Sequence, residues 1–297
     1  MILTTAGTSE AAAIPSVLDR THQGPVIAIG GAEDKFRDRV ILSRFTELAG
    51  GADARIVVIP TASSIESAGE RYKAIFLGLG VAQVDIAVIG DRPDANSDLI
   101  VDMIRQATGI FMTGGNQMRL AAIIGGTRAM NIILERNLQS AVVAGTSAGA
   151  SILSSHMVAY GSSGNSPKMR MAQMVAGFGL VPGAILDQHF RQRDRLGRLM
   201  MLVASNPSLL GVGVDEDTAA IFTNDSCIEI LGRHSVTIID GSEAYSDVYQ
   251  VKGHGGITLS GAKIHVLTSG HTFDMGGRTL LAKPPFVVPD GSTGSTS

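Results

Sequence analysis

Short apolar runs alternate with longer segments of helical periodicity along most of this 297-residue chain. Apolar runs that end in glycine-rich turns and are separated by helices are typical of buried parallel strands covered by helices on both faces. Functional loops in such a sheet gather at the carboxyl ends of the strands. The predicted strands are 25–29, 55–59, 83–89, 109–112 and 141–144, and the predicted helices are 37–49, 67–79, 98–107 and 120–136, the last with a possible break at 125–126.

After about Ala219 the pattern changes to closely spaced strands joined by turns. We expect these strands to be antiparallel and to extend one edge of the sheet. They are 219–222, 228–230, 236–239, 247–251 and 263–267. The chain shows no internal repeat and no linker composition. It is therefore predicted to be α/β, with a mostly parallel sheet and extra C-terminal antiparallel strands. We expect a flexible arm (1–24), one domain (25–285) and a flexible tail (286–297).

Composition argues against several classes of function. The formal net charge is −3 and the basic residues form no long runs, so nucleic acid is not expected as a partner. The single cysteine, Cys227, excludes an internal disulfide framework and a multi-cysteine metal site. No stretch reaches the roughly 18 apolar residues of a membrane span, and the N-terminus lacks the pattern of a secretory signal. We expect a cytoplasmic protein with no membrane partner.

Residues 145–149, Gly-Thr-Ser-Ala-Gly, fit the G-x-S-x-G motif. An apolar strand precedes them and an Ala-rich helix follows, which is the context that this motif requires. The glycines allow a sharp turn that raises the hydroxyl of Ser147 off the sheet, and the N–H of Ala148 can then donate to an oxyanion. The alternative is a small-residue turn capped by serine. The flanking strand and helix favour a nucleophile.

A second glycine-rich loop, 113–117, follows another buried strand. Adjacent glycines let backbone N–H groups approach a ligand closely. We expect the N–H of Gly115 to complete the oxyanion hole and Gln117 to touch substrate. The alternative is an ordinary turn capped by Asn116. Function is favoured because both loops would lie on the same edge of the sheet.

Two acidic segments also follow strands. Residues 30–35 resemble the start of a dinucleotide-binding loop but lack its third glycine. We interpret this segment as a turn that brings Glu33 and Asp34 to the active edge. Residues 213–217 form a second acidic strand end, either a binding site or a solvated loop.

The densest polar segment is 187–198. His189 is predicted at a strand end just before a helix that starts near Arg191. A nucleophilic serine needs a base with a pKa near neutrality, and histidine is the usual one. We therefore expect His189 to be the base, with a capping or structural histidine as the alternative. Each arginine of the segment either lines a binding pocket or lies on a solvated face of the helix.

Taken together, these segments resemble the cyanophycinases, serine exopeptidases related to aspartyl dipeptidase within the class I glutamine-amidotransferase-like fold. The resemblance spans about 25–282 and rests on motifs at 30–35, 59–62, 69–72, 113–117, 145–150, 187–190, 195–198 and 214–219. It implies that Ser147 is the nucleophile and His189 the base. The positions that it matches to substrate contacts are Gln117, Asp187, Gln188, Arg193, Arg195 and Arg198.

This chain departs from the family pattern at the third member of the triad. The family places an acid between the nucleophile and the histidine, but residues 148–186 contain no Asp or Glu. The aligned position is Asn165, and a neutral amide can orient a histidine without stabilising its cation. Alternatively, an acid from 215–217 reaches the histidine, or activity is weakened.

The resemblance implies hydrolysis of cyanophycin, a poly-aspartate with an arginine on each β-carboxyl, to β-Asp-Arg dipeptides. It implies no metal or organic cofactor, and it implies a homodimer. Arginine side chains suit the substrate carboxylates, and an acid such as Asp187 or Glu33 suits its guanidinium groups. The rival interpretations are an aspartyl dipeptidase of the same family, a weakened binding homologue, and an α/β-hydrolase-type esterase.

Overall fold

The computed structural model describes residues 23–224 and 226–282. The arm predicted over 1–24 lies outside the described residues except for Gln23 and Gly24. The predicted tail, 286–297, lies outside them entirely. Within the described ranges, no helix is long and apolar enough to cross a membrane.

The larger sheet has nine strands in the order β17-β16-β11-β10-β1-β5-β4-β2-β3. Strands β1, β5, β4, β2 and β3 run parallel, and β10, β11, β16 and β17 extend the β1 edge in antiparallel pairing. The predicted mostly parallel sheet with antiparallel additions is confirmed. Its strands are β1 (Val26–Ile29), β2 (Arg55–Ile59), β3 (Gln83–Ile86), β4 (Gly109–Met112), β5 (Val142–Thr146), β10 (Thr218–Phe222), β11 (Cys227–Gly232), β16 (Thr272–Asp274) and β17 (Thr279–Ala282).

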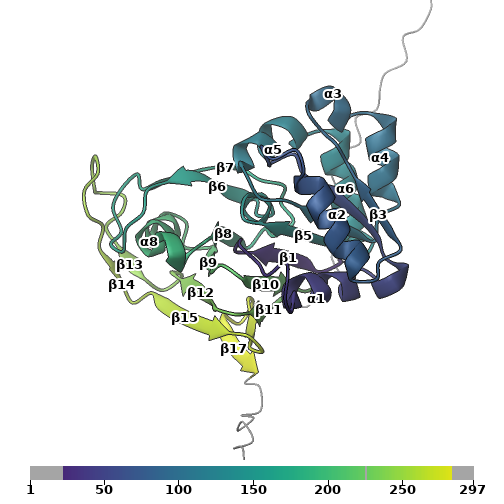
Figure 1. The fold of residues 1–297 in the computed structure, drawn as a ribbon. Helices are drawn as coiled ribbons and strands as arrows, with labels where there is room; N and C mark the ends of the chain where they lie inside the picture. Colours follow the sequence, from purple (N-terminus) through teal and green to yellow (C-terminus); the bar gives the residue numbers. More distant parts are fainter. Residues whose placement is uncertain (1–22, 225, 283–297) are drawn as a thin grey trace, which may run out of the picture.

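Helices cover both faces of this sheet (Figure 1). Alternate strand residues face opposite sides, so Ile27 packs in one core cluster and Ala28 in the other. Helices α1 and α2 cover the Ile27 side, and α4, α5 and α6 cover the Ala28 side. The helices are α1 (Val40–Leu48), α2 (Ala68–Gly78), α3 (Arg92–Ala95), α4 (Asp98–Arg105), α5 (Gln117–Ile124), α6 (Arg128–Leu138), α7 (Ala148–Ser151) and α8 (Leu196–Ser205), with 3-10 turns η1 (Gly51–Asp53) and η2 (Arg191–Arg193).

One helix begins later than predicted, for a local reason, and a predicted helix break is present. The predicted helix 37–49 begins only at Val40, because the carboxylate of Asp34 accepts the N–H groups of Phe36, Arg37 and Arg39 and holds the preceding loop. The possible break predicted at 125–126 is confirmed, because α5 ends at Ile124 and α6 begins at Arg128.

A second sheet of four strands, in the order β15-β12-β9-β8, was not predicted. Strands 236–239 and 263–267 were expected at the edge of the first sheet, but they belong to this second sheet as β12 and β15. Of the five strands predicted after Ala219, 219–222 and 228–230 do extend that edge, as β10 and β11. Segment 247–251 is a turn because the Asp247 carboxylate accepts the Thr258 N–H and its carbonyl accepts the Gln250 N–H. The strands are β8 (Ala184–Gln188), β9 (Leu210–Val214), β12 (Ser235–Asp240) and β15 (Lys263–Thr268).

Two hairpins complete the fold. Strands β6 (His156–Gly161) and β7 (Ala172–Ala176) pair antiparallel and project beside α8 (Figure 1). A short pair, β13 (Tyr245–Ser246) and β14 (Leu259–Ser260), lies near their far end. Neither hairpin was predicted from the sequence.

Candidate active site

Ser147 lies immediately after β5, on a turn that needs glycine at two flanking positions. A Cβ atom on Gly145 would collide with the carbonyl of Gly149, and one on Gly149 would collide with the carbonyl of Met112. Ser147 itself has φ 53° and ψ −111°, a strained conformation for a residue with a side chain. Its N–H donates to the Ile29 carbonyl at 2.9 Å, so β1 anchors the turn.

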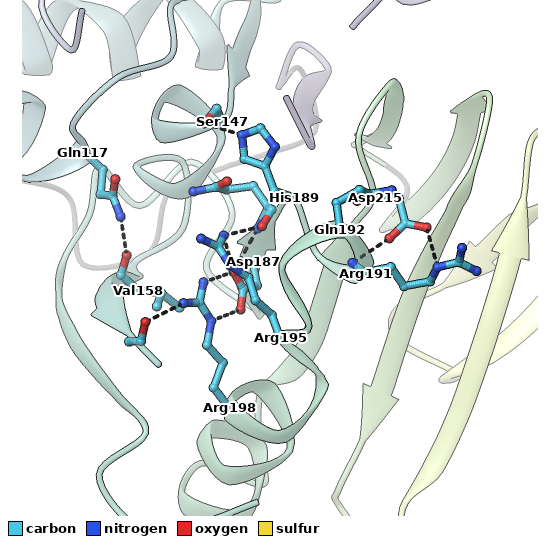
Figure 2. A network of polar contacts seen from close by, with 12 residues as sticks. Gln117, Ser147, Val158, Asp187, His189, Arg191, Gln192, Arg195, Arg198 and Asp215 are labelled. Atoms are coloured by element: carbon cyan, nitrogen blue, oxygen red, sulfur yellow. Dashed lines mark hydrogen bonds and ion pairs between the residues drawn. The ribbon is translucent and has the colours of Figure 1, made fainter. Parts of the chain in front are cut away.

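His189 faces Ser147 across the junction of the two sheets (Figure 2). Its Nε2 lies 2.9 Å from the Ser147 Oγ, within hydrogen-bond distance. His189 directly follows β8, and its backbone N–H donates to the Gly30 carbonyl at 2.8 Å. The carboxyl end of β8, in the smaller sheet, therefore meets the carboxyl ends of β1 and β5, in the larger one.

The other ring nitrogen of His189 contacts a carboxylate. Nδ1 lies 2.6 Å from the Oε1 of Glu216, which follows β9. In this arrangement Glu216, and not Asn165, occupies the position at the ring nitrogen where the sequence alignment had Asn165. Among the described residues, the ring nitrogens of His189 bond Ser147 and Glu216, whereas the Asn165 side chain accepts the Ser166 hydroxyl at 3.2 Å.

The three acids 215–217 have three different partners. Asp215 is fully buried and accepts the Arg191 N–H at 3.0 Å and the Ser235 hydroxyl at 2.9 Å. Asp217 accepts the Asp34 N–H at 2.8 Å. Only Glu216, between them, reaches the imidazole. No pattern within this acidic run distinguishes the three, so the sequence alone left the choice open.

Burial lowers the pKa of the His189 imidazole, and the nearby guanidinium groups of Arg193 and Arg195 lower it further. The hydrogen bond and the negative charge of Glu216 act in the opposite direction and only partly offset these effects. A depressed pKa keeps the ring neutral near neutral pH, which is the form that accepts a proton. A carboxylate at Nδ1 also selects the tautomer whose Nε2 faces Ser147.

The Gly30–Gly31 turn packs against both His189 and the 215–217 loop. A Cβ atom on Gly31 would lie 2.5 Å from the Nε2 of His189, so the imidazole packs directly on this glycine. The Gly31 carbonyl accepts the Asp217 N–H at 2.9 Å. A Cβ atom on Gly30 would collide with the carbonyl of Asp215. The turn thus fixes His189 and the loop that carries Glu216.

Glu33 lies under the nucleophile turn, not in a binding pocket. Its carboxylate accepts the Thr146 hydroxyl at 2.6 Å and the Tyr72 hydroxyl, and it pairs with the Lys35 Nζ at 2.9 Å. Burial and the adjacent Glu33 charge raise the pKa of Tyr72 well above its usual range. Because Glu33 is buried and fully engaged, the expectation that it holds a substrate guanidinium is not supported by its surroundings.

Two backbone N–H groups are suitable for an oxyanion. Ala148 begins α7 directly after Ser147, and the 113–117 loop passes the same side chain, since a Cβ atom on Gly114 would lie 3.7 Å from the Ser147 Oγ. Within the described ranges, the N–H groups of Gly115 and Ala148 donate to no backbone carbonyl. They are therefore free to donate to a reacting carbonyl oxygen.

Three of the predicted substrate contacts form a buried ion cluster (Figure 2). The Asp187 carboxylate accepts the Arg198 Nε at 2.6 Å and also its Nη2, and it pairs with the Arg195 Nη1 at 3.3 Å. All three side chains are at least nine-tenths buried, and burial lowers the pKa of Arg195 to about 10. The Asp187 carboxylate is therefore engaged by two guanidinium groups of this chain itself.

Of the remaining predicted contacts, Gln117 and Arg193 are more accessible, whereas Gln188 is buried. The Gln117 Nε2 donates to the carbonyls of Val158, at 3.1 Å, and Ala159, at 2.7 Å, which ties α5 to β6. Arg193 is exposed and makes no ion pair with any described residue. The Gln188 Oε1 is buried and has no partner in the described part of the chain.

The helix predicted from Arg191 starts five residues later. Residues 191–193 form a 3-10 turn, Asp194 adopts φ 46°, and α8 begins at Leu196. This turn contacts the loop that carries Glu216, because the Gln192 Oε1 accepts the Glu216 N–H at 3.0 Å. In the described ranges, no group of three or more His, Cys, Asp or Glu side chains is arranged to hold a metal ion.

Comparison with known proteins adds independent evidence. A family model described as peptidase family S51 matches residues 26–230. A cyanophycinase of Synechococcus elongatus is 40% identical over 271 residues, covering 90% of this chain and 84% of the relative. One from Nostoc sp. is 40% identical over 259 residues, covering 86% and 87%, respectively. The crystal structure of a peptidase from an acI-B1 Actinobacterium matches with a TM-score of 0.64, 21% identity, and coverage of 86% of this chain and 98% of that one, which supports the fold alone.

Proposed function

This chain belongs to peptidase family S51, and on that premise we propose that it is a serine exopeptidase that hydrolyses cyanophycin to β-Asp-Arg dipeptides. The observation that carries the proposal is the line of contacts from the Ser147 Oγ through the His189 ring to Glu216. Relatives that are named cyanophycinases and are about 40% identical over most of the chain support the choice of substrate.

The proposed reaction begins with attack of the Ser147 Oγ on the carbonyl carbon of the scissile backbone amide. His189 accepts the serine proton at Nε2, and Glu216 stabilises the resulting imidazolium at Nδ1. The N–H groups of Ala148 and Gly115 hold the oxyanion. His189 then protonates the leaving amine, which separates, and water attacks the acyl-enzyme with His189 again as the base. No step requires a group other than these residues and water.

The proposed substrate contacts follow from exposure and free hydrogen-bonding capacity. We propose that the exposed Arg193 holds a substrate carboxylate and that the Gln188 Oε1, which has no partner among the described residues, accepts an N–H of the substrate. The Oε1 of Gln117 has no partner among the described residues, since its amide nitrogen makes the contacts to β6. The buried ion cluster of Asp187, Arg195 and Arg198 lies inside the protein and supports these contact residues.

The rival interpretation as a non-catalytic binding homologue depended on the missing acid. Glu216 supplies a carboxylate at that place, 2.6 Å from the His189 ring. We further propose that the protein acts as a homodimer in the cytoplasm, as the family resemblance implies. Size-exclusion chromatography with light scattering measures the first of these properties and cell fractionation the second.

One experiment tests the proposal. The purified protein and Ser147→Ala are incubated separately with cyanophycin and with α- and β-aspartyl dipeptides. We expect soluble β-Asp-Arg from cyanophycin with the parent and none with the variant. Turnover of the dipeptides alone would instead identify an aspartyl dipeptidase, and no turnover of any substrate would refute the peptidase activity.

A further inference from the structure

A cavity of about 950 Å³ lies between the loop of the β6–β7 hairpin and the loop near His254. It is separate from Ser147, which is not among its lining residues. Its walls are fastened to each other, because the Met169 N–H donates to the Gly255 carbonyl at 2.9 Å and the Ile257 N–H donates to the Pro167 carbonyl at 3.0 Å. The cavity is thus built into the fold.

The wall of this cavity continues to the active site. The Gly164 N–H donates to the Asp194 carbonyl at 2.6 Å, next to the exposed Arg193. The carbonyl of Gly161 accepts the Arg198 Nη1 at 3.4 Å. At its other end, β6 is tied to Gln117 through Val158, as Figure 2 shows. A chain lying across the active site therefore has a short path along this hairpin into the cavity.

The ionic groups that line the cavity are basic. Residues 148–186, which include the whole hairpin, contain no Asp or Glu. Lys168 and Arg170 are exposed, line the cavity, and make no ion pair with any described residue. Arg170 also has φ 64°, a conformation that a non-glycine residue rarely adopts and that is often found at functional sites. His254 faces the same space from the opposite loop.

Neutral groups in the cavity suit a guanidinium. The Tyr160 side chain is 62% exposed and lines the cavity, and guanidinium groups stack on such rings. The Tyr160 hydroxyl donates to the Gln173 Oε1, which holds the ring across the hairpin. Asn165, the residue aligned with the missing acid, lines this cavity and adds an amide oxygen as an acceptor.

We propose that this cavity is a second binding site for the substrate polymer, which holds an Asp-Arg unit further along the chain than the two units that flank the scissile bond. Lys168 and Arg170 bind the carboxylate of that unit's arginine, and Tyr160 stacks on its guanidinium. The inference rests on the proposed function, because cyanophycin carries both groups on every unit. Holding a remote unit raises the effective concentration of the chain end at Ser147.

The test compares Lys168→Glu/Arg170→Glu with Arg55→Glu/Arg71→Glu, which makes the same change in net charge at exposed positions outside the cavity. Steady-state kinetics are measured with soluble long-chain cyanophycin and with a peptide of two Asp-Arg units, too short to fill both sites. For the cavity variant we expect KM for the polymer to rise about fivefold or more, with kcat and the KM for the short peptide unchanged.

The control variant should keep the parent's KM for both substrates. An unchanged polymer KM in the cavity variant would overturn the inference while leaving the proposed function intact. An equal rise in KM for polymer and short peptide would also overturn it, because the two residues would then act at the cleaved unit. An inactive parent would refute the proposed function, and the inference with it.

Discussion

Replacing Gly31 by alanine tests whether the backbone turn under His189 sets the geometry of the base. The added Cβ atom would lie 2.5 Å from Nε2 and 3.1 Å from Nδ1 of the imidazole. Ordinary contacts of this kind are 3.4–4 Å. The ring must therefore retreat by about 1 Å or rotate, because the Gly31 backbone is held by its bond to the Asp217 N–H.

The size of the effect follows from the distance between His189 and Ser147. The Nε2–Oγ separation is 2.9 Å, and a displacement of about 1 Å takes it beyond hydrogen-bond range. Misplacement of a reacting group by that amount costs on the order of 10²-fold in rate, and a positioned base contributes roughly 10²–10⁴-fold. We expect kcat to fall by about 10²- to 10³-fold, with little change in KM.

The matched control is Gly80→Ala. Gly80 has φ 90°, close to the φ 98° of Gly31, but nothing lies within 4 Å of its Cβ position. Both variants should therefore carry a similar backbone strain of about 1–2 kcal/mol, and only Gly31→Ala should lose activity. Cyanophycin turnover and urea unfolding are measured for both. A folded Gly31→Ala protein with activity within threefold of the control would refute the reasoning.

Three further predictions concern the site. Glu216→Gln should lower kcat by roughly 10²–10⁴-fold through loss of the His189 tautomer, whereas Asn165→Asp should leave kcat unchanged, as steady-state assays can check. The depressed pKa of His189 should place the acid limb of kcat/KM below the value of about 6.5 for a free imidazole, since the neutral ring is the active form. Arg193→Gln removes a cation that lowers this pKa, so the limb should move to higher pH in the pH–rate profile. Asp187→Ala leaves two buried guanidinium groups without a counter-charge and should lower the free energy of unfolding by about 3–5 kcal/mol in urea titrations.

Each of these has a contrary result. A gain of activity in Asn165→Asp would return that residue to the triad. An acid limb that stays in place in Arg193→Gln would mean that burial alone sets the His189 pKa. Unchanged stability with a raised KM in Asp187→Ala would show that the carboxylate serves the substrate and not the fold.

Local patterns sufficed for features whose physics is local. Apolar runs ending in glycine turns predicted the parallel strands, because strands covered on both faces must be apolar throughout. The G-x-S-x-G pattern predicted the turn at Ser147, since each of its glycines meets a neighbouring backbone carbonyl. His189 followed from its place at a strand end beside a polar segment.

Other features depended on partners distant in the sequence. The second sheet was missed because an apolar strand such as 236–239 carries no mark of which strand it will pair with. The pairing of Asp187 with Arg198 was missed for a related reason. The sequence of a polar segment does not show whether its charged side chains bind substrate or pair with one another. Segment 247–251 was wrongly predicted as a strand, because Asp247 closes it into a turn through Thr258.

The sequence by itself determined the class of fold, the nucleophile turn and the candidate base, because each depends on residues adjacent in the chain. Only the tertiary structure decided which of three consecutive acids contacts His189. Asp215 is buried and accepts the Arg191 N–H, and Asp217 accepts the Asp34 N–H, so neither carboxylate reaches the imidazole. It also decided that Asn165 lines a cavity. A carboxylate's partner is set by distances of a few ångströms, and these are established only when the two sheets pack together.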